Sequence, residues 1–246
     1  MAAARSRLFT FGTGNFYQRF LTKMEYEEGY YDQVIRLCQK LETDGIELFF
    51  AYNESVKRFS ISSESEEWIR KQKRITIHAP PSLPEDEAEL QEVLATIDKI
   101  YRRLGAEQLI IHPVSFPDRR ILDRFGFRVS TENLGRKRNI SISMLRKIAE
   151  KSGAGLCLDI AHAYLWSKNE TRKIIRAFDG KITQVHFSAV SDSLPHVSLS
   201  SADADFLYSI EPVRQLKVPV VIEQNMGTMS TSFANKEIRS IKNFFA

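Results

Sequence analysis

Eight polar side chains stand at the ends of apolar runs of the sequence or in the loops that follow them, and their types are those that hold metal ions and move protons. The clearest case is GLCLDIAHAY at residues 155–164, where an apolar run leads to Asp159 and, three positions later, to His162. Five of the eight are histidines, which are all the histidines of the chain, and three are carboxylates. The set is His78, His112, Glu132, Asp159, His162, His186, His196 and Glu223.

Each of these residues has an ordinary explanation when it is taken alone. A single histidine at a strand end is often a satisfied core or loop residue, and a lone glutamate can cap a turn. If all eight converge, however, so many polar groups in one place are costly unless something compensates them, which a divalent metal does directly. Mixed nitrogen and oxygen ligands suit zinc, manganese, iron or cobalt better than calcium or magnesium.

The elements that must position these residues follow from the hydrophobic pattern. Short apolar or β-branched runs alternate with amphipathic stretches, which is typical of alternating strands and helices in a parallel sheet. We expect strands at 7–12, 45–50, 74–79, 108–113, 128–133, 155–160, 182–187 and 218–223. We expect helices at 30–42, 85–105, 141–153 and 206–216, with a short one within 115–127. The second and third helices close on a glycine, the usual stop signal.

Eight strand-then-helix units in 246 residues predict an α/β fold, a closed (β/α)₈ TIM barrel that forms a single domain over residues 1–246. An open doubly wound sheet is the alternative. Reactive groups of a (β/α)₈ barrel lie at the carboxyl ends of the strands and in the loops that follow them. Seven of the eight polar residues lie at or just after a predicted strand end, and His196 lies in the loop after the seventh strand. We therefore expect all eight to line one mouth.

Positive charge gathers in one segment of the chain. The formal net charge is +4, and residues 117–138 alone hold seven basic side chains against three acidic ones. Such a run can be a solvated helix face. The alternative is a phosphate-binding rim, because guanidinium groups hold phosphate oxygens in bidentate pairs. The candidate rim residues are Arg119, Arg136, Lys137 and Arg138.

Several classes of protein are disfavoured by the sequence. No apolar stretch approaches the ~18 residues of a membrane span, and the first residues lack the apolar region of a secretion signal, so we expect a cytoplasmic protein without a membrane partner. Two cysteines, Cys38 and Cys157, cannot build a disulfide framework. Tyr17 stands where a dinucleotide-binding loop beginning at Gly12 would need its third glycine.

The motifs ITIHAP, LIIHPV, STEN, LCLDIAHA, QVHFS and VVIEQN span most of the chain. As a set they resemble the xylose-isomerase-like TIM barrels, a superfamily of sugar-phosphate isomerases and epimerases that also includes endonuclease IV and the UV-damage endonuclease. The resemblance implies a shared metal site formed by Glu132, Asp159, His186 and Glu223.

The other histidines distinguish the branches of that superfamily. His78 and His112 resemble ligands of a second metal, bridged by Glu132, in the endonucleases, whereas in isomerase-type members they line the substrate pocket. His162 and His196 resemble two ligands of the third endonuclease metal. The sequence has Leu194 where endonuclease IV has an aspartate, so this third site lacks a ligand. It also lacks the His-x-x-Asp that isomerase members often carry after strand seven, since it has HFSAVSD there.

Two activities follow from the resemblance. The favoured one is a metal-dependent sugar or sugar-phosphate isomerase or epimerase, in which Glu132 and Glu223 act as general acid and base on a small carbohydrate or phosphorylated substrate. The alternative is an endonuclease-type phosphodiesterase that acts on damaged DNA with two or three metals. We therefore expect one to three divalent ions, with zinc or manganese favoured over iron or cobalt, and the oligomeric state is left open.

Overall fold

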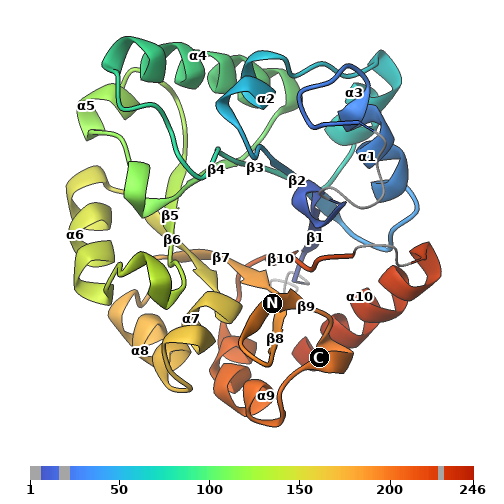
Figure 1. The fold of residues 1–246 in the computed structure, drawn as a ribbon, viewed down its shortest axis with the longest axis vertical. Helices are drawn as coiled ribbons and strands as arrows, with labels where there is room; N and C mark the ends of the chain where they lie inside the picture. The colour runs from blue at the N-terminus through green and yellow to red at the C-terminus, as the bar shows by residue number, and fades with distance from the viewer. Residues whose placement is uncertain (1–6, 17–22, 227–229) are drawn as a thin grey trace, which may run out of the picture.

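The strands close into one barrel (Figure 1). The computed structural model describes residues 7–16, 23–226 and 230–246. Eight parallel strands form the barrel in chain order, and the last pairs with the first: β1 (Phe9–Gly12), β2 (Gly45–Phe49), β3 (Arg74–His78), β4 (Gln108–Ile111), β5 (Val129–Glu132), β6 (Gly155–Asp159), β7 (Ile182–Phe187) and β10 (Val220–Ile222). The predicted (β/α)₈ TIM barrel is confirmed, and each predicted strand overlaps an observed one.

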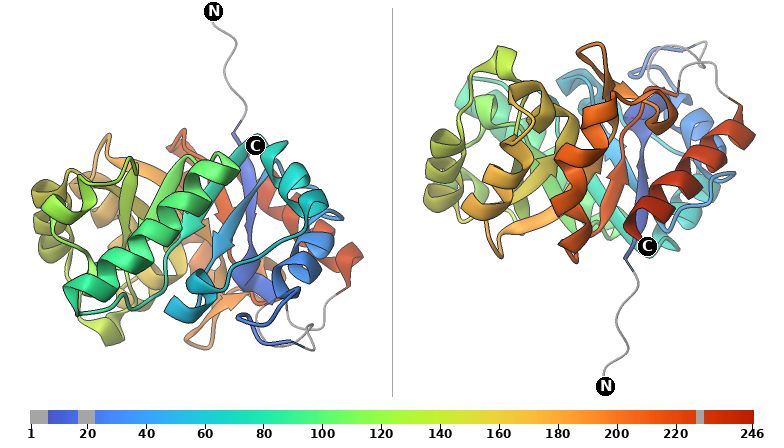
Figure 2. Two further views of the ribbon diagram at one scale, coloured as in Figure 1. Left: turned by 90° about the horizontal axis from the view of Figure 1, so that it is seen from above. Right: turned by 90° about the horizontal axis from the view of Figure 1, so that it is seen from below.

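The helices form a ring outside the strands (Figures 1 and 2). They are α1 (Tyr30–Cys38), α2 (Asn53–Lys57), α3 (Ser63–Arg70), α4 (Glu87–Leu104), α5 (Arg119–Leu122), α6 (Ile142–Ser152), α7 (Ile160–Trp166), α8 (Glu170–Ala177), α9 (Ala204–Ile210) and α10 (Thr231–Phe245). The stop signals after α4 and α6 are confirmed, because Gly105 and Gly153 adopt the left-handed conformation, at φ 71° and 74°. Among the described helices, none is long and apolar enough to cross a membrane.

A small hairpin after β7 was not predicted. Its antiparallel strands are β8 (Ala189–Ser191) and β9 (Leu194–Val197), and its two-residue turn places Asp192 and Ser193 at φ 49° and 65°. Such turns usually carry glycine, so the sequence lacks the usual signal. The hairpin projects from the carboxyl end of the barrel, whereas the C-terminal residue lies at the opposite end (Figure 2).

The interior of the barrel is polar, in contrast to the apolar layer between strands and helices. Glu47, on β2, and Gln184, on β7, are hydrogen-bonded although their strands are not neighbours, so both side chains point into the barrel. The alternate residues Ile46, Leu48 and Val185 are fully buried in the main hydrophobic cluster. Successive side chains of a strand point to opposite faces. The apolar layer therefore holds the helices in place and leaves the interior free for polar groups.

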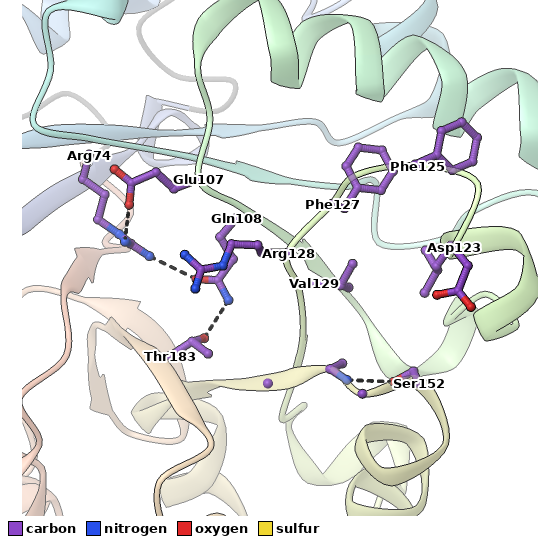
Figure 3. A pocket seen from close by; sticks show the side chains of 14 residues that line it. Arg74, Glu107, Gln108, Asp123, Phe125, Phe127, Arg128, Val129, Ser152 and Thr183 are labelled. Carbon is purple, nitrogen blue, oxygen red and sulfur yellow. Dashed lines mark hydrogen bonds and ion pairs between the residues drawn. The ribbon is translucent and has the colours of Figure 1, made fainter.

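The amino end of the barrel is filled by polar groups that bond to one another. Gln108 Nε2 donates to the hydroxyls of Ser130 and Thr183, and Gln108 Oε1 accepts from the buried guanidinium of Arg74 at 3.1 Å. Arg74 also donates to Glu107 at 3.0 Å (Figure 3). A cavity of about 530 Å³ borders this cluster.

Candidate metal centre

Four strands bring four potential metal ligands to the carboxyl end of the barrel. Glu132 and Asp159 are the last residues of β5 and β6, His186 is the penultimate residue of β7, and Glu223 directly follows β10. The register of β6 and β7 places Asp159 beside His186. One ligand atom from each of the four lies within 4.8 Å of the others. Parallel strands thus build a compact set of three carboxylates and one imidazole.

The Asp-x-x-His spacing has a local structural role. Asp159 caps α7, because its Oδ1 accepts a hydrogen bond from the backbone N–H of His162 at 2.6 Å. Asn133 bonds to the backbone N–H and C=O of Asp159, at 2.9 and 2.7 Å, and so ties the end of β5 to the end of β6. The His162 ring then lies with Nδ1 3.3 Å from Glu132 Oε1. One carboxylate oxygen of Asp159 is used by the cap and the other, Oδ2, is left for the site.

Two further histidines approach Glu132 from the other side. His78 Nε2 lies 3.0 Å from Glu132 Oε2, and His112 Nε2 lies 3.8 Å from the same oxygen. The two rings are nearly perpendicular, with centroids 5.0 Å apart. His78, Glu132 and His186 form a second group whose ligand atoms lie within 4.8 Å of one another. Glu132 and His186 belong to both groups, and of the two only Glu132 has two oxygen atoms with which to bridge two ions.

His196 completes the cluster from the hairpin. Its backbone has φ 61°, and its Nδ1 lies 3.1 Å from the backbone oxygen of Glu223. The rings of His196 and His162 have centroids 5.5 Å apart. Leu194, on the same strand β9, is 65% exposed and offers no ligand atom. The structure therefore places all eight residues of the sequence analysis in one connected cluster, and their roles as ligands stay predictions.

The charges of the cluster are strongly coupled. Burial raises the pKa of Glu132, but the charge of His186 and hydrogen bonds from His162 and His78 outweigh it and hold the pKa well below its usual range. Burial lowers the pKa of His186, but the facing thiol of Cys157 and carboxylates of Glu47, Glu223 and Glu132 raise it well above its usual range. Without a cation, protons on imidazoles balance the carboxylates.

The pKa values of Asp159 and Glu223 are shifted in opposite directions. Burial raises the pKa of Asp159 to about 6, because the charges of Glu223 and Glu132 add to the loss of solvent. Burial also raises the pKa of Glu223, yet the contact of Glu223 with His186 lowers this pKa to about 2. At neutral pH, three carboxylates in ionised form surround a small volume, which suits a divalent cation.

The buried atoms without partners support a cation at this position. Within the described residues, Asp159 Oδ2, His186 Nδ1 and Glu223 Oε2 are buried and have no hydrogen-bond partner. His186 Nδ1 lies 3.0 Å from Glu223 Oε2, although not in hydrogen-bonding geometry. Buried polar atoms are nearly always paired, so unpaired ones require an explanation. All three belong to the four-residue group, and their mixed nitrogen and oxygen character fits a zinc-type or manganese-type ion.

Glu47 is a buried carboxylate of the site that the sequence analysis missed. It lies on β2, is 2% exposed, and places Oε1 3.1 Å from His186 Nε2. Burial raises its pKa, but the charge of His186 and its hydrogen bond lower it below the usual range. The sequence GIELFF did hold a signal, because a carboxylate stands between two apolar residues of a strand. It stands inside the strand, whereas the eight predicted residues stand at strand ends or in loops.

The four basic candidates lie outside the cluster. Arg136, Lys137 and Arg138 are exposed in the short turn after β5, and Arg119 is exposed at the start of α5 with Asp123 3.5 Å away. Within the described residues, no hydrogen bond or ion pair joins these four to the eight. The turn nevertheless begins beside the site, since a Cβ at Gly135 would lie 3.7 Å from the His162 ring. A phosphate-binding rim there stays a prediction.

A concave space borders one side of the cluster, at His196 and Glu223. A cavity of about 460 Å³ lies at the mouth, and its lining combines polar and aromatic side chains, among them Asn15, Phe49, Tyr52, His196, Glu223 and Asn225. Ligand pockets for small molecules have about 300–1,000 Å³. Both side-chain amide atoms of Gln224, which also lines the cavity, are buried without a partner within the described residues. The mouth can therefore hold a small polar ligand beside the cluster.

Comparisons with known proteins support the fold. Neither a family model nor a curated protein matches the chain in sequence. A D-tagatose 3-epimerase-like protein superposes with a TM-score of 0.70 at 14% identity, over 96% of each chain. Endonuclease IV from Thermus thermophilus superposes with a TM-score of 0.66 at 15% identity, over 96% of this chain and 98% of the endonuclease chain. A xylose isomerase domain containing protein from Salmonella typhimurium gives 0.65 at 16%, over 97% of each. The chain thus has the fold of the xylose-isomerase-like TIM barrels, as the sequence motifs implied.

Proposed function

We propose that this protein is a divalent-metal-dependent enzyme with its metal centre at Glu132, Asp159, His186 and Glu223. The observation that carries the proposal is the coincidence of two properties in these residues. Their ligand atoms lie within 4.8 Å of one another, and three of them are buried without a hydrogen-bond partner in the described part of the chain. The similarity in fold to an epimerase-like protein and to endonuclease IV supports an enzyme of this type.

We further propose that the reaction is the isomerisation or epimerisation of a sugar or sugar phosphate. The mouth cavity of about 460 Å³ has the size of a small-molecule site, and its lining places polar amides beside Phe49 and Tyr52. This size suits a monosaccharide better than a DNA duplex. The D-tagatose 3-epimerase-like protein is among the neighbours in fold.

The residues of the site can divide the work of such a reaction. A bound divalent ion would polarise adjacent oxygens of the substrate. Glu132 and Glu223 are both ionised at neutral pH and both face His186 Nδ1, at 3.5 and 3.0 Å. One carboxylate can remove the proton on the carbon beside the carbonyl, and the carboxylic acid so formed can return that proton to the neighbouring carbon in an isomerisation. In an epimerisation, the other carboxylate would first take up a proton from water and then donate it to the opposite side of the same carbon. Asn15, Gln224 and Asn225 line the cavity and can orient the hydroxyls.

Multi-metal phosphodiester hydrolysis is the second candidate. It is favoured by the group of His78, Glu132 and His186, which would allow a second ion with Glu132 as the bridge. His112 lies 3.8 Å from Glu132 but belongs to neither group of potential ligands. Against it stands the third site, where His162 and His196 meet without a further ligand from the exposed Leu194. Catalytic zinc sites generally have three protein ligands. We therefore place this activity second.

Proton exchange tests the proposed reaction whichever sugar is the product. The protein, loaded with manganese, cobalt or zinc, is incubated in deuterated water with a panel of ketoses and their phosphates, and in parallel with a duplex that carries an abasic site. We expect one sugar to take up deuterium beside its carbonyl, and Glu132→Gln to abolish the uptake. Strand cleavage without deuterium uptake on any sugar would establish the second candidate instead.

A further inference from the structure

We infer that Glu47 is a positioning residue, which holds the Nε2–H of His186 and thereby makes Nδ1 the metal-binding nitrogen. The inference rests on the proposed metal centre and adds a residue that does not itself belong to it. Among the residues that the structure describes, Glu47 is in neither group of potential ligands. Its place is beneath His186, inside the barrel, and 2% of its surface is exposed.

The two nitrogens of His186 face different surroundings. Nε2 points down to Glu47 Oε1, 3.1 Å away. Nδ1 points to the potential ligands, with Glu223 Oε2 at 3.0 Å and Glu132 Oε2 at 3.5 Å. Metal-bound histidines almost always donate their other N–H to a carboxylate, a carbonyl or water, which fixes the tautomer and the ring orientation. Glu47 has the position that such a carboxylate requires.

Glu47 is itself held in place by two donors on its other oxygen. Oε2 accepts hydrogen bonds from Thr76 Oγ1 and Gln184 Nε2, both at 2.8 Å. The orientation of the Gln184 amide follows from Arg74, whose guanidinium donates to Gln184 Oε1 at 3.2 Å. Because Thr76 and Gln184 occupy Oε2, Oε1 is left to accept from His186. A chain of hydrogen bonds thus runs from Arg74 at the amino end, through Gln184 and Glu47, to the potential ligand.

The opposite tautomer of His186, with its proton on Nδ1, would need a hydrogen-bond donor to Nε2, and Gln184 is the candidate. Gln184 Nε2 lies 3.0 Å from His186 Nε2, so it could donate there and leave the ring proton on Nδ1. The Gln184 amide has two protons, however, and Glu47 Oε2 and Cys157 Sγ, at 2.8 and 3.6 Å, can accept them. A hydrogen bond that His186 donates to the Glu47 carboxylate is stronger than a hydrogen bond that His186 accepts from the neutral Gln184 amide. The Nε2–H tautomer therefore accounts for every proton in this group.

The experiment compares the zinc-loaded wild type with Glu47→Ala and Glu47→Gln. Long-range ¹H–¹⁵N correlation spectra of the histidine rings report which nitrogen carries the proton, and the His186 signals are assigned by their loss in His186→Asn. We expect a slowly exchanging Nε2 proton in the wild type. Competition with a chelator should show zinc affinity reduced about 10–100-fold in Glu47→Ala, the usual cost of losing such a partner. Glu47→Gln keeps an accepting carbonyl and should recover part of the affinity.

Glu237→Gln is the matched control, because it also removes a buried carboxylate. Glu237 lies on α10 and accepts a hydrogen bond from the backbone N–H of Leu199 at 2.8 Å. It should leave zinc affinity and the His186 signals unchanged. Zinc bound through Nε2 in the wild type would overturn the inference, and this result does not depend on how the variants fold. Unchanged affinity in Glu47→Ala would overturn it while the metal centre stands. A wild type that binds no zinc would overturn the proposed function and the inference with it.

Discussion

The two ends of the barrel interior are both lined by buried polar groups, but they differ in how these groups are satisfied. At the amino end, Gln108 uses its amide oxygen and nitrogen on Arg74, Ser130 and Thr183, and one atom of the cluster, Arg74 Nε, is buried and unpaired. At the carboxyl end, five atoms of four residues are buried without partners in the described structure. They belong to Asp159, His186, Glu223 and Gln224.

This difference separates stability from function. A paired polar cluster fixes the packing of the strands and needs nothing from outside the protein. An unpaired cluster is costly to the protein alone, and such local departures from favourable interactions are expected at functional sites. Among the described residues, the cluster at the amino end thus leaves one buried atom, Arg74 Nε, without a partner, whereas the carboxyl end leaves five, which the proposed cation and substrate would satisfy.

The largest difference between the ends should appear in activity. Glu132→Gln should reduce turnover of a true substrate by about 10²–10⁴-fold, because it removes a general acid or base and a potential ligand. Glu107→Gln is the control at the amino end, where it weakens a half-exposed contact with Arg74. It should leave turnover within about twofold of the wild type. Steady-state rates of both variants give the comparison, and turnover retained in Glu132→Gln would remove Glu132 from the mechanism.

Metal affinity should depend on pH. The pKa of His186 is raised well above its usual range, by the facing Cys157 and the carboxylates of Glu47, Glu223 and Glu132, so its ring carries a proton on both nitrogens at neutral pH in the absence of metal. Metal binding to His186 must displace one of these protons. The association constant should therefore fall as pH is lowered, by about tenfold per unit for each proton displaced. Calorimetry in two buffers of different ionisation enthalpy counts the protons, and no proton release would show that His186 is not a ligand.

The basic turn after β5 should affect phosphorylated ligands specifically. The triple variant Arg136→Ala, Lys137→Ala and Arg138→Ala should weaken the binding of a sugar phosphate by about tenfold, since charge-assisted hydrogen bonds to phosphate are lost. The affinity for the unphosphorylated sugar should stay unchanged. Arg146→Ala on α6 is a matched surface control. Titrations at low and high salt measure the effect. Equal loss for both sugars, or none for either, would assign the turn to the solvated surface.

Stability should respond in opposite ways at the two ends. Gln108→Ala breaks a paired cluster and should lower the free energy of unfolding by about 1–3 kcal/mol without a change in metal affinity. Asp159→Asn removes a buried charge whose pKa is raised to about 6, and asparagine can still cap α7. It should raise the free energy of unfolding of the metal-free protein by about 1 kcal/mol at pH 7, because a carboxyl group whose pKa is raised by folding costs stability once it is ionised. It should also abolish tight metal binding. Denaturation in the presence of a chelator measures the free energy of unfolding of both variants. A lower value for Asp159→Asn than for the wild type would contradict the expected difference between the two ends.

The barrel and the position of the eight residues followed from local sequence properties. Strand periodicity and the glycines at 105 and 153 are short-range signals, and a parallel barrel brings all strand ends to one mouth. The predicted helix at 206–216 was only partly right. It divides into α9 and a 3₁₀ turn at Glu211–Gln215, where Pro212 has no N–H to donate. The β8–β9 hairpin was missed because its turn uses Asp192 and Ser193 instead of glycine.

The role of Glu47 could not be derived from its own strand. It depends on a contact with His186, which lies far along the chain, and on Gln184 and Thr76 from β7 and β3. Distances of this kind come from barrel closure, and no local pattern encodes them. The absence of partners at Asp159 Oδ2 is likewise visible only once all neighbouring strands are in place.

The metal content of the protein tests the central claim most directly. The protein is purified without added metal, dialysed extensively, and measured by elemental analysis together with Asp159→Asn and Gln108→Ala. We expect about one tightly held divalent ion per chain in the wild type and in Gln108→Ala, none in Asp159→Asn, and a second ion that depends on the supplied concentration. A wild type that holds no stoichiometric metal, even after incubation with zinc or manganese, would contradict the account.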